Sequence, residues 1–280
     1  MEPNDGENES MKWVVRQTIF AACMLLGTAC ATTSVKQPAS GETNTIAAEK
    51  STLPNSSAEL HKILDDAADY GPDEGKGLLA IAAATKLFED NSLTRIHGWK
   101  GARAIFLTVI ANRKLLNAER ANQCDNWSRV SDENKKQVES NLYHALCLGL
   151  KAQVFPTQGL GLIKTMLKRA EQVEQLDATF EHSAGARLMG GIYLKAPAWP
   201  TSVGDSELAI EHLERAVKNS AEWPENSLLL AEAYYEEDRI EDAQKVLQQV
   251  RKQLSSYPDN GWRRHFQKTL EEVASELSDD

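Results

Sequence analysis

The chain has 280 residues, of which 41% are hydrophobic and 26% charged, and its formal net charge is −10 at pH 7. A chain of this length and composition can bury one or two ordinary hydrophobic cores. The acidic balance argues against a nucleic-acid or anionic-membrane binder, because phosphate groups are bound by clustered lysines and arginines, and the sequence has no such basic cluster. Aromatic residues make up only 6%, which suits a helical repeat protein better than a β-sandwich.

The first 29 residues have the pattern of a secretory signal peptide. After an acidic stretch, Met11 opens a basic start, which is followed by an apolar run at 18–26 and by small residues before Cys30. The apolar run is too short to span a membrane as a helix. Because an acidic leader before the basic region is unusual, Met11 is a candidate for the true start.

The residues before Cys30 resemble a bacterial lipobox, although Gly27 stands where leucine is usual. We therefore expect Cys30 to be the lipid-attachment residue. The alternative is an ordinary signal peptide followed by a chance cysteine. Ala31, rather than Asp, follows the cysteine, a pattern that resembles that of lipoproteins sent to the outer membrane and that predicts a protein facing the periplasm.

Residues 30–57 are rich in Thr, Ser, Ala, Gly and Pro and have no apolar periodicity. We expect a flexible tether that holds the folded domain, residues 58–280, away from the membrane. The lipid anchor is then the only predicted attachment to the membrane.

The folded domain shows helical apolar spacing from its start and no strand signals. We predict helices, in order, over residues 58–71, 77–90, 98–119, 137–155 and 160–173. Residues 120–134 are predicted to form a loop, and Pro156 is predicted to end the fourth helix. The alanine-rich helix at 77–90 implies close packing against its neighbours.

The second half contains a repeat. Two predicted helices have small and large apolar residues at the offsets of the tetratricopeptide unit, which is about 34 residues long. The small residues lie where two antiparallel helices approach closely, and the large ones fill the space beside them. These positions are Leu230, Ala231, Tyr234, Ala243, Leu247 and Val250.

An earlier copy of the same pattern precedes this unit. It consists of Met189, Gly190, Tyr193, Ala209, Leu213 and Ala216. A third, degenerate copy is indicated by the pair Leu148-Gly149 and by the helix at 160–173. A final helix at 262–277 is expected to cap the stack with a polar outer face, as terminal repeats require. The predicted fold is therefore all-α: an α-solenoid of degenerate tetratricopeptide-like helix hairpins with a C-terminal capping helix.

The earlier unit contains an insertion. From Tyr193 to Ala209 there are 16 positions, whereas Tyr234 to Ala243 takes 9, an excess of seven. The inserted segment includes Pro197, Trp199, Pro200 and Gly204, and Asp205 is a candidate helix cap. Insertions in solenoids map to loops, often on the binding face.

Two interpretations of this insertion stay open. Trp199 either plugs the stack as a core residue, with Pro197 and Pro200 stiffening the turn, or serves as an anchor for a partner or ligand. In the second interpretation Tyr193, Arg187 and Tyr234 line the same groove, and Arg187 offers a clamp for a carboxylate.

No catalytic or cofactor motif is present. The segment at 71–77 lacks the spacing and the hydroxyl residue of a P-loop, and the glycines at 159–161 lack the third glycine of a dinucleotide fingerprint. The sequence contains neither an HExxH motif nor a GxSxG motif, and the six histidines are scattered. We therefore expect a non-enzymatic protein without a metal or cofactor.

After the expected lipid-attachment residue Cys30, the sequence contains two more cysteines, Cys124 and Cys147. An exported chain meets an oxidising compartment, where the two cysteines, 23 positions apart, are able to pair. Alternatively, Cys147 is a small apolar core residue between Leu146 and Leu148.

The run from Asn141 to Val250 resembles the T-component (TatT-type) lipoproteins of TRAP transporters. The resemblance rests on LYHALCLGL at 142–150, GARLMGGIYLKAPAWPTSVGD at 185–205 and AIEHLERAV at 209–217. It implies a lipid-anchored α-solenoid that docks a periplasmic solute-binding protein and assists solute uptake. The alternative is a general scaffold lipoprotein that binds other envelope proteins in outer-membrane or cell-wall assembly. A homo-oligomer stays open, and no nucleic-acid partner is expected.

Overall fold

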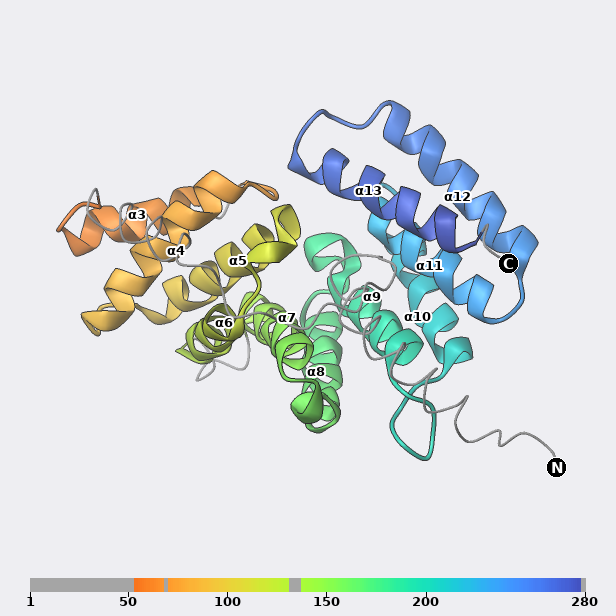
Figure 1. Ribbon diagram of the computed structural model, residues 1–280, viewed down its shortest axis with the longest axis horizontal. Helices are drawn as coiled ribbons and strands as arrows, with labels where there is room; N and C mark the ends of the chain where they lie inside the picture. Colours follow the sequence, from red (N-terminus) through yellow and green to blue (C-terminus); the bar gives the residue numbers. More distant parts are fainter. Residues whose placement is uncertain (1–52, 68–69, 131–136, 278–280) are drawn as a thin grey trace. The chain divides into compact units, whose positions relative to one another are not determined.

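The structure, a computed structural model, describes residues 53–67, 70–130 and 137–277. The predicted signal peptide, the candidate start Met11, the lipid-attachment residue Cys30 and the tether up to position 52 lie outside the described residues. Eleven α-helices, α3 to α13, and one short 3-10 helix make up the secondary structure of the described residues, which contain no β-strand (Figure 1). The chain divides after Val154 into two compact units.

The described part of the N-terminal unit has five α-helices. They are α3 (Ser57–Ala67), α4 (Glu74–Glu89), α5 (Arg95–Ala111), α6 (Ala118–Val130) and α7 (Val138–Val154), with η1 (Arg113–Leu115) between α5 and α6. Each helix packs against the next one along the chain, and α5 also contacts α3 and α7. Packing between neighbours and next neighbours is the pattern of a helical repeat stack.

The described part of the C-terminal unit has six helices. They are α8 (Pro156–Leu176), α9 (Phe180–Lys195), α10 (Ser206–Asn219), α11 (Pro224–Glu236), α12 (Ile240–Ser255) and α13 (Gly261–Glu276). Here too each helix packs against its successor, and α11 also contacts α9 and α13. The all-α solenoid of tetratricopeptide-like hairpins is therefore confirmed, with α9–α10 and α11–α12 as the two clearest repeats.

The periodic positions named from the sequence form the core of these two repeats. Ala209, Leu213 and Ala216 are buried on α10, and their counterparts Ala243, Leu247 and Val250 are buried on α12. The apolar stripe of each helix faces its partner, because burying that stripe is the main source of helix stability in water.

Gly190 marks the closest approach of α9 to α10. A Cβ atom at this position would lie 2.5 Å from Leu213 Cγ and 3.2 Å from the carbonyl oxygen of Ala209. A Cβ atom at the adjacent Gly191 would have no atom within 4 Å. The absence of a side chain at Gly190 thus allows the two helices to pack at their observed separation.

Helix α13 closes the C-terminal unit. Phe266 on α13 is fully buried and meets Trp223 and Tyr257 edge to face, with ring centroids 5.0 and 5.5 Å apart. The opposite face of α13 is polar and exposed, with Arg264, Gln267, Lys268 and Glu271. The predicted capping helix is therefore confirmed.

The predicted loop at 120–134 is wrong, because most of it is helix α6. The apolar residues on the buried face, Ala121, Cys124 and Trp127, alternate with buried polar ones, including Asp125. Asp125 accepts hydrogen bonds from Lys151 Nζ at 2.6 Å and from Arg129 Nε at 2.7 Å. A buried face that includes a carboxylate and its cations has no clean apolar period, so the sequence pattern did not reveal this helix.

Several predicted helix ends also differ from the structure. Helix α4 begins at Glu74 instead of 77, because the Asp73 carboxylate caps it by accepting from Lys76 N at 2.9 Å. Helix α5 ends at Ala111 rather than 119. Pro156 has two roles: α7 ends at Val154, just before the proline, as predicted, and Pro156 opens α8, where the missing N–H of a proline costs nothing.

The folded part begins slightly before the predicted position 58. Leu53 is buried, and Lys86 Nζ on α4 donates to the carbonyl of Pro54 and to Asn55 Oδ1, both at 2.9 Å. Residues 53–56 therefore pack against the N-terminal unit instead of belonging to a free tether.

Cys124 on α6 and Cys147 on α7 form a disulfide, with their Cα atoms 5.3 Å apart. The bond joins two helices that pack side by side, and both cysteines are fully buried. By lowering the conformational entropy of the unfolded chain, a disulfide that closes a loop of this size stabilises the folded state by about 3 kcal/mol.

The close contact at Gly190 generates a paired test. Gly190→Ala should lower the free energy of unfolding by about 1–3 kcal/mol, because the added methyl group forces α9 away from α10. Gly191→Ala, the matched control in the same helix, should be neutral or stabilise by up to about 1 kcal/mol, since alanine is the better helix former. Urea unfolding of the two variants measures the difference, and equal stabilities would contradict the packing described.

Candidate functional site

The insertion predicted from the sequence is the α9–α10 loop (residues 196–205). Asp205 N donates to the carbonyl of Tyr193 at 2.9 Å, and Gly204 N donates to the carbonyl of Pro197 at 2.8 Å. These two bonds close the loop at its base, so that it leaves and re-enters the repeat at one place.

Gly204 makes the narrow base of the loop possible. A Cβ atom there would lie 2.0 Å from the carbonyl oxygen of Ala196. Since that oxygen belongs to the backbone, it has no way to swing aside, and any larger residue would open the loop.

Trp199 lies on this loop and is 84% exposed. Pro197 is buried at the base, Pro200 is exposed beside the tryptophan, and the Trp199–Pro200 peptide bond is cis. The interpretation of Trp199 as a core plug is therefore wrong, because its indole ring contacts mainly solvent. Tryptophan is among the residues enriched at the centres of protein–protein interfaces.

The loop is also fixed to both repeats at its C-terminal end. Asp205 caps α10 by accepting from Leu208 N at 2.9 Å, as predicted. Next to it, the Ser206 hydroxyl donates to the carboxylate of Glu237 at the end of α11. Because the cap and this hydrogen bond both lie immediately beside the loop, they limit how far it can move.

Tyr193 supports the loop from the last turn of α9. Its ring stacks on His212 of α10, with centroids 5.4 Å apart. Burial and the positive charge of Arg215 lower the pKa of His212, so its ring is neutral at pH 7. Tyr193 thus lies at the base of the loop, where its carbonyl accepts from Asp205 N and its ring packs on α10.

Arg187 does not belong to this region, so its predicted role as a carboxylate clamp beside Trp199 is wrong. It lies eight residues before the end of α9, which corresponds to about 12 Å along a helix. Its guanidinium donates to the carbonyl of His182 at 2.9 Å and to Asn226 Oδ1 at 3.0 Å, and it pairs with Glu225 at 3.6 Å.

These contacts give Arg187 a structural role. Glu181, His182 and Ser183 at the start of α9 all have positive φ angles, which L-residues seldom adopt. The carbonyls of Glu181 and His182 both accept from Arg187, so its guanidinium stabilises this unusual backbone. The same guanidinium also donates to Asn226 on α11, so a tertiary contact helps to hold this strained segment.

Tyr234 is likewise part of the core and not of a groove. It is 8% exposed, and its hydroxyl donates to the Glu214 carboxylate at 2.8 Å. Arg239 stacks over its ring at 4.1 Å from the centroid. Burial and the hydrogen bond to Glu214 raise the pKa of Tyr234 to about 12, so the phenol stays neutral and ties α11 to α10.

Ionisable side chains also pair between alternate helices of the C-terminal unit. Lys195 on α9 and Glu232 on α11 pair at 2.7 Å, with side chains 8% and 6% exposed. Glu225 on α11 lies 3.6 Å from His265 on α13. Burial alone would raise the pKa of Glu225, but His265 and Arg187 lower it below its usual value, and the carboxylate stays ionised.

The sequence carried a signal for these pairs that the repeat pattern obscured. Glu232 interrupts an apolar run on a helix whose small residues, Ala231 and Ala233, are fully buried. A carboxylate beside such positions needs a cation nearby, because an unpaired buried charge is costly. Lys195, the last residue of α9, is that cation.

Two of the histidines that look isolated along the sequence meet in the fold. His61 of α3 and His97 of α5 stack with ring centroids 4.1 Å apart, and His97 also contacts Asp65 at 3.0 Å. Across the described ranges, no group of three or more His, Cys, Asp or Glu residues is arranged to hold a metal ion. The helices of the described residues also include none that is both long and apolar enough to cross a membrane.

Helix packing, buried repeat positions and a capping helix together define a tetratricopeptide-like α-solenoid. Folds of this class are typically non-enzymatic scaffolds for protein–protein interaction. A family model of the tetratricopeptide repeat matches residues 202–259, which include α10, α11 and α12. A comparison with curated proteins found no match.

The buried pair yields a prediction about stability. Lys195→Met should destabilise the protein by about 3–5 kcal/mol, because it removes the cation opposite a buried carboxylate. The double variant Lys195→Met/Glu232→Leu should recover most of that loss, since an apolar pair of similar size avoids the desolvation cost. Chemical unfolding of both variants checks this, and a single variant as stable as the wild type would refute it.

Proposed function

We propose that this protein is an exported, lipid-anchored interaction module that docks a partner protein through Trp199 on the α9–α10 loop. The observation that supports this proposal most is the exposure of Trp199 on a loop that is longer than the repeat requires and is closed by hydrogen bonds. Burying an exposed indole on binding releases water from a large apolar surface. A loop already held in place loses little conformational entropy when it binds.

The proposed partner is a periplasmic solute-binding protein. This follows from the resemblance of residues 141–250 to the T-component lipoproteins of TRAP transporters, which assist solute uptake. The part of that resemblance at 185–205 includes the whole loop with Trp199. An accessory role of this kind requires a docking surface and no catalytic group of its own.

Export and anchoring rest on the signal pattern that ends at Cys30. A cysteine acylated with more than one chain would hold the protein on the membrane, since a single chain binds only marginally. The buried disulfide between Cys124 and Cys147 supports export, because such bonds form and persist in oxidising compartments.

Substitution of the exposed tryptophan tests the docking role. Trp199→Ala should weaken partner binding by about 2 kcal/mol or more, roughly 30-fold in Kd, while the free energy of unfolding changes by less than about 0.5 kcal/mol. Affinity capture from solubilised envelopes, followed by mass spectrometry, should recover a solute-binding protein with the wild type and not with this variant.

Leu160→Ala is the matched control, because Leu160 is an exposed large apolar residue on α8 of the same unit. It should capture the partner as the wild type does. Equal capture by Trp199→Ala would overturn the docking role. Recovery of envelope-assembly proteins in place of a solute-binding protein would keep the docking role and indicate the scaffold function.

The anchor is tested separately. Cys30→Ser should move the protein from the membrane fraction to the soluble fraction, because no acyl chain is attached. The wild type should be labelled by a palmitate analogue in growing cells. Cys23→Ser, which changes a cysteine inside the predicted signal, is the control and should be labelled as well as the wild type. A wild-type protein that is not labelled and is found in the soluble fraction would contradict lipid attachment at Cys30.

A further inference from the structure

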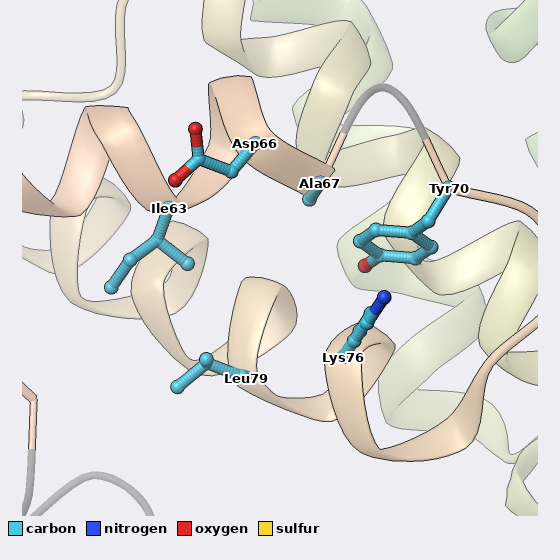
Figure 2. A pocket seen from close by; sticks show the side chains of 6 residues that line it. All are labelled: Ile63, Asp66, Ala67, Tyr70, Lys76 and Leu79. Carbon is cyan, nitrogen blue, oxygen red and sulfur yellow. The ribbon is translucent and has the colours of Figure 1, made fainter.

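A pocket of about 410 Å³ opens between α3 and α4 in the N-terminal unit. It is lined by Ile63, Asp66 and Ala67 of α3, by Tyr70 of the connection, and by Lys76 and Leu79 of α4. Figure 2 shows Tyr70 and Lys76 turned toward each other at one end, with Ile63 and Leu79 at the other. Its volume is in the range of ligand-binding pockets, about 300–1,000 Å³.

One end of the pocket is apolar. Leu79 on α4 is 41% exposed, and Ile63 on α3 is only half-buried. Neither residue has its side chain fully covered, so an apolar chain placed between them would remove both from water.

The other end offers two hydrogen-bond donors. The Tyr70 hydroxyl is buried and has no hydrogen-bond partner among the described residues, although buried polar groups are nearly always paired. Lys76 Nζ lies 5.8 Å from the centre of the Tyr70 ring and pairs with no carboxylate in the described part of the chain. Burial raises the pKa of Tyr70 to about 12, so its phenol keeps its proton at neutral pH.

The acidic groups nearby are already occupied. Asp66 at the rim pairs with Lys62 Nζ at 2.8 Å, and Asp73 accepts from the backbone N–H of Lys76 at 2.9 Å. Lys62 offsets the charge of Asp66, whereas the hydrogen bond leaves the charge of Asp73 in place, so the cation that an anion meets at the polar end is the Lys76 ammonium.

The pocket is also held in shape from behind. The Arg103 guanidinium of α5 donates to the carbonyl of Ala67 at 3.2 Å and to that of Tyr70 at 3.0 Å. Its Nε donates to the buried Tyr143 hydroxyl at 2.9 Å, which links the pocket wall to α7. These bonds hold the backbone at Ala67 and at Tyr70 in place before any ligand arrives, so less order has to be gained on binding.

We infer that this pocket binds a small amphipathic carboxylate, an apolar chain of medium length that ends in a carboxylate group. The chain lies between Ile63 and Leu79. The carboxylate accepts a hydrogen bond from the Tyr70 hydroxyl and pairs with the Lys76 ammonium. The site lies in the N-terminal unit and does not depend on the role proposed for Trp199.

Octanoate is the probe that tests this assignment, added below its micelle concentration to the full-length protein. Titration calorimetry should show saturable binding to the wild type, and binding should weaken about tenfold in Tyr70→Phe and in Lys76→Gln, each of which removes one partner of the carboxylate. Leu79→Asn should weaken binding as well, because it makes the apolar end polar. Circular dichroism confirms that each variant is folded.

Lys218→Gln, at an exposed lysine of α10, is the control and should bind octanoate as the wild type does. Octylamine, with the same chain and the opposite charge, and acetate, with the head group alone, should each bind at least about tenfold more weakly than octanoate. The assignment is overturned if octanoate shows no saturable binding or if octylamine binds equally well. It is also overturned if Tyr70→Phe and Lys76→Gln both keep the wild-type affinity.

Discussion

Helix α9 lies against α10 only because position 190 has no side chain. The Leu213 side chain and the Ala209 carbonyl occupy the space that a Cβ atom would need. The same need for small residues recurs in the next repeat, where Ala231 and Ala243 are fully buried. Protein interiors are close-packed, so the spacing of each helix pair follows from these few positions.

This spacing has a consequence for polar residues. When helices pack closely in a stack, alternate helices also come near one another, as α11 does to α9 and α13. Charged side chains at those contacts must pair, as Lys195 does with Glu232 and Arg187 does with Glu225. Arg187, which the sequence suggested as a ligand-binding residue, therefore joins two helices instead.

Close helix packing does not restrict the middle of a loop, because only the ends of the loop must fit the spacing of the helices. The α9–α10 loop is closed at its base by hydrogen bonds and by the close approach at Gly204. Its outer part is free to expose Trp199. In the N-terminal unit, Tyr70 and Lys76, which is in the first turn of α4, similarly lie together at one end of a pocket (Figure 2). Both candidate surfaces therefore include residues of the connections between helices.

Sequence periodicity was enough to predict the all-α solenoid, the two clear repeats, the capping helix and the cap at Asp205. These features depend on local spacing of apolar and small residues, which a linear pattern records. The pattern failed for α6, because a buried Asp125 paired with cations looks the same in sequence as a solvated one.

The candidate site, too, was predicted only in part from the sequence. The insertion around Trp199 was visible as an excess of seven positions, because the repeat sets an expected length. The sequence by itself determined that a loop is there and which residues it contains. Only the tertiary structure decided that Trp199 faces solvent and that Arg187 and Tyr234 serve the core. The physical reason is that burial and pairing depend on neighbours that are 20 to 40 positions away along the chain, as Glu214 is from Tyr234 and Asn226 is from Arg187.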